Sequence, residues 1–414
     1  QAEFLPTILP AWKEAFASGV VEAATSPYHH PIQPLLVTSL AAREALPKLP
    51  LPHPPFSRPE DARAQLALGL GTFERHFGFR PAGMWPPEGS LSEAAVRLMA
   101  EAGVRWAASD EDVLLGSLPA GRKEFGSAGS RARLVFRPHR LSGGASPALF
   151  FRDRLLSDRI GFSYATWTAA EAAADFVARL RSIHEAAPEA GLVVPVILDG
   201  ENAWESYPEN GAPFLRTLAA ALARETWIEV TTPARVLESG TAPVPLDRLT
   251  AGSWIGASFS TWIGHPSKNR AWELLSHASE TLGRQLDGAP VVSPLEVVRR
   301  HAGGAAAARA AFLAAEASDW FWWFGDDHSS AQDPIFDALF RSHLSAAYRY
   351  LGHAVPAALA EAVERGKGAM KVFETTPISP TIDGTRPDFF EWLGPTRYAS
   401  EAQGAMSRSA GLVK

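Results

Sequence analysis

The chain has 414 residues, a formal net charge of -6 and an isoelectric point of about 6.1. This length allows one large domain with a sizeable core and a smaller one beside it. The mildly acidic balance, without a polybasic stretch, argues against nucleic acid and anionic lipid as partners. The absence of cysteine excludes disulfides, thiolate nucleophiles and cysteine-ligated zinc. No apolar stretch approaches the roughly 18 residues of a membrane span.

The first residues, Gln1-Ala2-Glu3-Phe4-Leu5, contain neither an initiator methionine nor a signal-peptide pattern, so we expect the chain to begin inside a longer protein. The lack of cysteine is typical of a reducing compartment, from which we predict a cytoplasmic location. No sequence feature predicts an oligomeric state.

Helix and strand signals alternate through the first half of the chain, which predicts an α/β fold. We expect helices over residues 57–78, 91–102, 169–186 and 210–224, and strands over residues 104–110, 192–198 and 226–230. The run 192–198 is continuously apolar, as in a parallel sheet covered on both faces, although Pro195 cannot donate to a ladder. The basic stretch 131–140 indicates a surface loop. Polar residues at the carboxyl ends of strands are typical of barrel enzymes.

The second half is mostly helical and rich in alanine, with helices expected over residues 269–286, 294–301, 305–317 and 331–351. From Lys371 the sequence becomes β-like, with proline and glycine punctuation. We therefore predict a catalytic (β/α) barrel over residues 1–265, a helical subdomain over residues 266–366 and the start of a β-domain over residues 367–414.

A rigidly held glutamate stands in the segment Gly83-Met84-Trp85-Pro86-Pro87-Glu88-Gly89. The two prolines force an extended backbone before Glu88, at a predicted strand-to-helix turn. A glutamate in this place often serves only the dipole of the next helix. The rigid frame and the neighbouring indole favour a catalytic nucleophile, because such a group benefits from fixed geometry.

A second carboxylate follows the apolar run, in the segment Leu198-Asp199-Gly200-Glu201-Asn202-Ala203-Trp204-Glu205. At the rim of a sheet, Asp199 either caps the next turn or takes part in chemistry. Glu201 is a candidate to bind a sugar hydroxyl or to tune Asp199 by like-charge repulsion. Two carboxylates from separate strand ends, framed by indoles, suit hydrolysis of a glycosidic bond.

Tryptophan is unusually frequent, with 13 residues against 6 tyrosines. Indoles can simply fill a core, but Trp85, Trp204 and Trp254 lie close to glycine or acidic residues. An indole takes the C–H face of a sugar while a carboxylate takes its hydroxyls. Retaining glycosidases hold their carboxyl groups about 5 Å apart and inverting ones about 6.5–9.5 Å, and sequence spacing does not decide between them.

Two adjacent histidines, His29 and His30, raise the alternative of a metal site. On an extended segment neighbouring side chains point to opposite faces, which argues against joint chelation. The segment Gly325-Asp326-Asp327-His328 suits either a hard cation or, more simply, a cap for the following helix. We predict no metal and no cofactor. No Gly-x-Ser-x-Gly elbow supports Ser-His-Asp chemistry.

At these residues the chain resembles family 57 of the glycoside hydrolases, the group of α-amylases, amylopullulanases and 4-α-glucanotransferases. The segment ending at Glu88 is similar to the family's third region, whose glutamate is the nucleophile. The segment around Asp199 is similar to the fourth region, whose aspartate is the acid/base. Val21-Glu22 with the segment 26–31 resembles the second region, and the segment 252–264 resembles the fifth.

The resemblance implies an incomplete (β/α)7 barrel, followed by a helical subdomain and the start of a β-domain. It also implies double displacement at α-glucosidic bonds, with retention of configuration and no obligatory metal. Residues 318–322 are similar to a family segment whose aspartate and later tryptophan line the sugar site. The candidate substrate-binding residues are therefore Glu22, His29, His30, Trp85, Glu201, Trp204, Trp254, Asp319 and Trp322.

The resemblance extends over almost the whole chain, with two departures. The family's first region, a His-Gln-Pro segment, is absent and would lie upstream of Gln1. The β-domain stops soon after the segment 389–394. We expect either a fragment of a longer enzyme or a natural short form, with an open edge on the barrel.

The sequence thus predicts a retaining hydrolase of the α-amylase or amylopullulanase type, acting on starch- or glycogen-like α-glucan, with Glu88 as nucleophile and Asp199 as acid/base. Three alternatives stay open. The first is a 4-α-glucanotransferase or branching enzyme on the same scaffold. The second is a metal-dependent carbohydrate deacetylase that uses His29, His30 and an aspartate. The third is a non-catalytic glucan-binding fragment.

Overall fold

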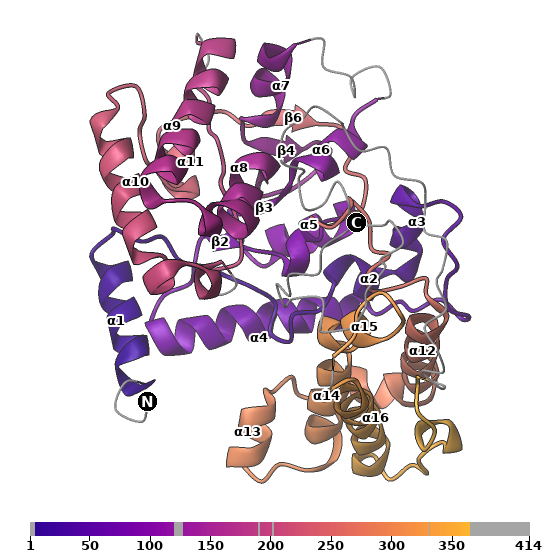
Figure 1. Cartoon of the computed structure of the whole chain (residues 1–414). Helices are drawn as coiled ribbons and strands as arrows, with labels where there is room; N and C mark the ends of the chain where they lie inside the picture. Colours follow the sequence, from indigo (N-terminus) through magenta and orange to yellow (C-terminus); the bar gives the residue numbers. More distant parts are fainter. Residues whose placement is uncertain (1–4, 120–126, 189–190, 201–202, 331, 365–414) are drawn as a thin grey trace. The chain divides into compact units, whose positions relative to one another are not determined.

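The computed structural model describes residues 5–119, 127–188, 191–200, 203–330 and 332–364, which are coloured in Figure 1. The described residues form two compact units. Of the described residues, unit 1 contains those up to Val104 and those from Thr250 to Glu364, and unit 2 contains Arg105–Leu249. The predicted β-domain, residues 367–414, lies outside the described residues.

Unit 1 is built mainly from helices. Its two short strands pair in parallel, with Ala24 opposite Gly83 and Thr25 opposite Met84. The main elements in chain order are α1 (Leu5–Ala17), β1 (Ala24–Thr25), α2 (Gln33–Val37), α3 (Ala42–Ala45), α4 (Pro59–Phe77), β2 (Gly83–Met84), α5 (Glu93–Glu101), α12 (Pro266–Asp287), α13 (Pro294–Arg299), α14 (Gly304–Ala315), α15 (Ser318–Trp323) and α16 (Asp333–Tyr350).

Helix α4 shows how local sequence sets the helix boundaries in unit 1. Pro59 occupies the first turn, where its missing N–H costs no hydrogen bond, and two acidic residues follow it at the positive end of the dipole. Gly78 ends the helix in the left-handed conformation, with φ 84°. The helix predicted over residues 57–78 is confirmed, with Arg58 as its N-cap.

The last helices of unit 1 pack around a dense aromatic core. Trp262, Trp272 and Phe321 are all buried, and Trp272 stacks on Phe321 with ring centroids 4.3 Å apart. The helices predicted over residues 269–286, 294–301, 305–317 and 331–351 are confirmed within a few residues as α12, α13, α14 and α16. None of the described helices is both long enough and apolar enough to span a bilayer.

Unit 2 holds a mixed sheet with the strand order β3-β5-β4-β6. Strand β3 is parallel to β5, β4 is antiparallel to β5, and β6 is parallel to β4. Every residue of β3 and β5 is buried. The main elements are β3 (Trp106–Asp110), α6 (Glu111–Ser117), α7 (Ala128–Val135), β4 (His139–Leu141), β5 (Ala148–Arg152), α8 (Arg154–Asp158), α9 (Ala169–Ala186), α10 (Ala212–Arg224), α11 (Pro233–Glu238) and β6 (Val244–Leu246).

Helices α9 and α10 lie side by side in unit 2 and share an apolar core (Figure 1). Tyr164, Phe176 and Phe214 are buried between them and the preceding turns. A capping box fixes the start of α9, because Thr168 accepts from the Glu171 N–H and the Glu171 carboxylate accepts from the Thr168 N–H. The predicted helix 169–186 is confirmed at both ends.

Three predictions in unit 2 are wrong. Residues 192–198 form no strand, because Pro195 lacks an N–H donor and its neighbours make only single hydrogen bonds. Their side chains are half-buried. Residues 226–230 form a turn and an irregular segment, with Trp227 bound through its indole to Glu225. The basic stretch 131–140 is no loop, because it contributes to α7 and to β4.

The contact between α4 and the segment after β1 makes a testable prediction. A Cβ at Gly69 would lie 2.3 Å from the Ser26 carbonyl oxygen, whereas a Cβ at Gly71, in the same helix, would meet nothing within 4 Å. We expect Gly71→Ala to stabilise the protein by about 0.5–1 kcal/mol, as alanine does in a helix. We expect Gly69→Ala to destabilise it by about 1–3 kcal/mol, because the backbone must move. Chemical denaturation measures both, and equal effects would contradict the contact.

Candidate functional site

Glu88 lies in a tight turn directly after β2, in the short helix Pro87–Gly89 (η2). Pro86 is extended, with φ -61° and ψ 139°, and Glu88 then enters the left-handed region, with φ 57° and ψ 26°. The Gly89 N–H donates to the Pro86 carbonyl at 2.8 Å and closes the turn. A non-glycine residue in this conformation stores backbone strain, which clusters at functional sites.

Trp254 contacts Glu88 through both its backbone and its side chain. Its N–H donates to the Glu88 carbonyl at 3.0 Å, and its indole Nε1–H donates to Glu88 Oε2 at 2.7 Å. A hydrogen bond donated to a carboxylate stabilises the ionised form, which is the form that a nucleophile needs. Both side chains are half-buried, so the carboxylate is held without being sealed from solvent.

The loop that carries Trp254 is fixed against the Glu88 turn by a two-bond bridge. Leu91 and Gly252 exchange N–H to carbonyl hydrogen bonds of 2.8 and 3.0 Å. A Cβ at position 252 would lie 2.5 Å from the Ala257 carbonyl oxygen. Only glycine allows this close approach of two backbone segments, which explains its place two residues before Trp254.

Trp85 completes the group around Glu88. Its ring meets the ring of Trp254 edge-on, with centroids 4.9 Å apart and planes at 62°. Its backbone is hydrogen-bonded to the end of β1 and to the residue after it. The Trp85 N–H donates to the Thr25 carbonyl at 3.0 Å, and the Trp85 carbonyl accepts from the Ser26 hydroxyl at 2.7 Å. Three of the predicted site residues, Glu88, Trp85 and Trp254, therefore lie together.

His29 is held by Gln65 of α4. The Gln65 Oε1 accepts from the His29 N–H at 3.2 Å and lies 3.1 Å from His29 Nδ1. The Gln65 amide nitrogen donates to the Leu313 carbonyl and to Glu316 Oε2, at 2.9 and 3.1 Å, which fixes the orientation of the amide. His29 Nδ1 therefore carries the proton. Its Nε2 is a buried acceptor without a hydrogen-bond partner in the described part of the chain.

Burial determines the charge of both groups that flank Gln65. It lowers the pKa of His29 to about 4, against a smaller raising effect of Gln65, so the imidazole is neutral at neutral pH. Burial and the neighbouring Asp61 raise the pKa of Glu316 well above its usual range. Asp61 is in turn paired with Arg58 and with Arg309, and this polar cluster fixes α4 against α14.

His30 contacts the beginning of α15. Its Nδ1 lies 2.8 Å from the Ser318 hydroxyl, and its carbonyl accepts from the Ser318 N–H at 3.2 Å. The two histidine rings thus pair with different elements. Asp319 follows Ser318 and is exposed. Within the residues that the structure covers, no group of three or more histidine and acidic side chains is arranged to hold a metal ion.

Trp322 also lies on α15, with its ring stacked on His328 at 4.1 Å between centroids. The cluster around His328 does not cap the following helix, which was the simpler of the two interpretations of its sequence. Asp327 pairs with the fully buried Lys268 and with His328. The following helix, α16, begins only at Asp333, which accepts from the Ser330 N–H at 2.8 Å.

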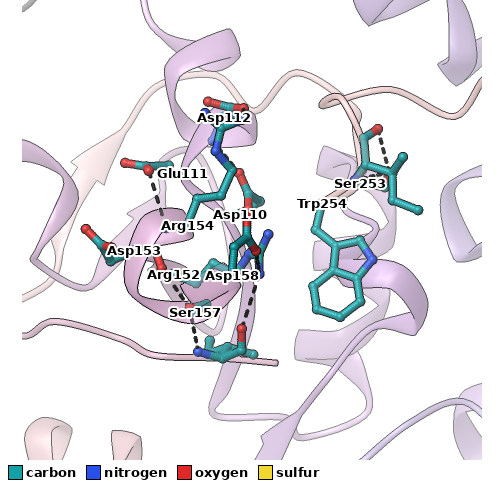
Figure 2. Close-up of polar contacts among 12 residues, drawn as sticks. Asp110, Glu111, Asp112, Arg152, Asp153, Arg154, Ser157, Asp158, Ser253 and Trp254 are labelled. Atoms are coloured by element: carbon teal, nitrogen blue, oxygen red, sulfur yellow. Dashed lines mark hydrogen bonds and ion pairs between the residues drawn. The ribbon is translucent and has the colours of Figure 1, made fainter. Parts of the chain in front are cut away.

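Asp199 belongs to unit 2 and lies at the end of the irregular segment after α9. Its side chain is half-buried. The segment before it is fixed at Ile197, whose N–H donates to Ser157 Oγ at 3.0 Å and whose carbonyl accepts from Arg152 Nη1 at 3.3 Å. Figure 2 shows Arg152 beside Asp110 and Asp158, its two ion-pair partners.

Trp204 packs into the apolar core of unit 2. A Cβ at Gly211 would lie 2.5 Å from its ring, and Tyr207 and Phe214 lie 5.4 and 6.5 Å from it between centroids. One face of Trp204 is therefore already occupied by protein. Glu22 lies two residues before β1 and is half-buried. Glu201, the neighbour proposed to tune Asp199, lies outside the described residues.

Sequence reasoning missed the polar residues that hold the predicted ones. Gln65 lies in α4 and Glu316 directly follows α14, and both are buried. Arg152 and Ser157 follow an apolar run. The detectable signal was the charged segment Arg152-Asp153-Arg154 directly after Ala148–Phe151, which marks the end of a buried strand. Asp110, at the end of the predicted strand 104–110, was a second signal of the same kind.

Comparison with protein families identifies the chain. A sequence model of glycosyl hydrolase family 57 matches residues 1–245, which is more than half of the chain. The chain belongs to glycosyl hydrolase family 57. No curated protein matches it.

Solved structures show the same fold at low sequence identity. A family 57 branching enzyme from Thermococcus kodakaraensis has a TM-score of 0.62 and 20% identity, over 83% of this chain and 68% of that one. The 4-α-glucanotransferase from Thermococcus litoralis has 0.57 and 16%, over 84% and 51%. The α-amylase AmyC from Thermotoga maritima has 0.55 and 14%, over 83% and 69%. The predicted α/β fold of the family, the incomplete (β/α)7 barrel, is confirmed by these matches.

The pKa of His29 predicts how stability depends on pH. The folded pKa, about 4, is below the ordinary 6.5, so below pH 6.5 the unfolded chain takes up the proton first. We expect the free energy of unfolding to fall as pH decreases from 6.5 to about 4, and this part of the slope to vanish in His29→Asn. Denaturant titrations at several pH values measure it. The control is His353→Asn, which removes a solvent-exposed hydrogen bond to Gln285. A slope unchanged in His29→Asn would contradict the assignment.

Proposed function

We propose that this family 57 chain acts on α-glucosidic bonds of starch- or glycogen-like glucans by double displacement, with Glu88 as nucleophile and Asp199 as acid/base. The observation that carries the proposal is the Glu88 turn. Its carboxylate is fixed in a strained backbone and receives the indole hydrogen bond of Trp254 at 2.7 Å. Fixed geometry and a stabilised anion are the two properties that a carboxylate nucleophile requires.

The steps follow from the roles of the two carboxyl groups. Glu88 attacks the anomeric carbon and forms a glycosyl-enzyme while Asp199 gives a proton to the leaving glycosidic oxygen. Asp199, now ionised, removes a proton from water or from an acceptor hydroxyl, which attacks the same carbon and releases Glu88. The configuration is retained because the anomeric carbon is inverted twice.

The indoles and the histidines provide the sugar contacts in this proposal. Trp85 and Trp254 lie beside the nucleophile and offer aromatic faces to a sugar ring. The neutral His29 offers Nε2 as an acceptor for a hydroxyl. Glu22, His30, Glu201, Trp204, Asp319 and Trp322 complete the proposed substrate-binding set, and for Trp204 only the face away from Gly211 is open to this role.

The final acceptor decides between two candidate activities on the same scaffold. Water as acceptor gives a hydrolase of the α-amylase or amylopullulanase type. A sugar hydroxyl gives a 4-α-glucanotransferase or branching enzyme, and two of the similar structures carry those names. The proposed location is the cytoplasm. Product analysis with a maltooligosaccharide separates the two, since a transferase yields longer or branched chains as well as shorter ones.

Removing either carboxylate tests the mechanism. We expect Glu88→Gln and Asp199→Asn each to lower kcat on a soluble maltooligosaccharide by at least about 10³-fold, because each step needs its carboxyl group. With an activated substrate, we expect azide to restore turnover in Asp199→Ala but not in Glu88→Gln. A wild-type rate in either variant would reject that residue's role, and glucan binding without turnover in the unaltered chain would indicate a binding protein instead.

The Trp254 hydrogen bond makes a separate prediction. A hydrogen bond to a charged group contributes about 1.5–3 kcal/mol, so we expect Trp254→Phe to lower kcat/KM by roughly 10- to 100-fold. The matched control is Trp227→Phe, which removes an indole to carboxylate bond of 2.6 Å, to Glu225 in unit 2. Steady-state kinetics measure both variants. A loss of the same size in the control would show that the effect is not specific to Glu88.

A further inference from the structure

Single hydrogen bonds, and not a strand ladder, fix the backbone that leads to Asp199. Ile197, two residues earlier, donates its N–H to Ser157 Oγ at 3.0 Å and accepts at its carbonyl from Arg152 Nη1 at 3.3 Å. The Pro195 carbonyl accepts from the Asp153 N–H at 2.8 Å. All three partners lie between residues 152 and 157, at the end of β5 and in α8. One short segment therefore controls the approach to the acid/base.

Arg152 is itself held rigidly. It is the last residue of β5, is 2% exposed, and pairs through Nε with Asp110 at 2.6 Å and through Nη1 with Asp158 at 2.9 Å (Figure 2). Asp110 ends β3 and accepts from the Asp112 N–H at 2.9 Å, at the start of α6. The guanidinium thus joins β3, β5 and α8 before it reaches the Ile197 carbonyl.

Ser157 has a fixed hydroxyl orientation. Its Oγ donates to the Asp153 carbonyl at 2.7 Å, which leaves a lone pair for the Ile197 N–H. Asp153 in turn caps α8 by accepting from the Leu156 N–H at 2.7 Å. Ser157 is fully buried, so the bond to Ile197 does not compete with water.

We infer that Arg152 and Ser157 are positioning residues for Asp199, an inference that rests on the proposed function. A general acid must stay within a fraction of an ångström of its productive position beside the glycosidic oxygen. A buried arginine paired with two carboxylates adds less to stability than apolar packing does, since the cost of desolvation offsets most of the attraction. The cluster gains a role from what it reaches, because Arg152 and Ser157 each bond one of the two backbone groups of Ile197.

The test uses two substrates that differ in their need for an acid. A maltooligosaccharide has a poor leaving group that must be protonated, whereas an α-maltosyl fluoride releases fluoride without a proton. Both need Glu88 equally. A displaced Asp199 therefore lowers kcat/KM on the first substrate alone, while partial unfolding of the protein lowers both together.

Ser157→Ala is the primary variant, because it removes one acceptor and leaves the charged residues in place. We expect kcat/KM on the maltooligosaccharide to fall at least about tenfold and that on the fluoride to change less than about threefold. The control is Ser182→Ala, whose hydroxyl donates to the carbonyl four residues earlier in α9, as that of Ser157 does in α8. We expect the control to keep both rates.

Arg152→Lys is the second variant. It keeps a positive charge beside Asp110 and Asp158 but loses the planar fork that reaches Ile197, so we expect the same substrate-dependent loss. Equal losses on both substrates, or no loss on either, would overturn the inference. If the unaltered protein turns over neither substrate, the proposed function itself fails and the inference fails with it.

Discussion

The double contact between Trp254 and Glu88 is the constraint on which the candidate site depends. The backbone bond fixes where the turn of Glu88 lies, and the indole bond fixes where its carboxylate points. Glu88 occupies a strained left-handed conformation that the turn alone would not select. The Leu91–Gly252 bridge supplies the missing constraint, since it holds the tryptophan loop against the turn. Residues 166 positions apart thus form one rigid group.

The segment from Ser26 to His30 extends this constraint through unit 1. Ser26 binds the backbone of Trp85, His29 binds Gln65 of α4, and His30 binds Ser318 of α15. The carbonyl of Ser26 also packs closely against Gly69, so the segment lies directly on α4. The position of the aromatic residues beside Glu88 therefore depends on helices that carry no catalytic group themselves.

Local signals in the sequence were sufficient to predict the long helices α4, α9, α12, α14 and α16. Pro59 and Gly78 define α4, and Thr168 with Glu171 defines the start of α9. The failures share a cause. The apolar run 192–198 has the composition of a strand, but its hydrogen bonds go singly to side-chain and backbone groups distant in sequence, which periodicity does not encode. The same reason hid Gln65 and Arg152, because a buried polar residue is recognised only through its partners.

The contacts of the two candidate carboxyl groups agree with their proposed roles. In the proposed mechanism Glu88 attacks the anomeric carbon as an anion, and the indole of Trp254 donates to one of its oxygens. Asp199 gives up a proton in the first half of that reaction and takes one back in the second half. The hydrogen bonds at Ile197 fix the backbone two residues before Asp199, and a fixed backbone serves both protonation states of the carboxyl group equally.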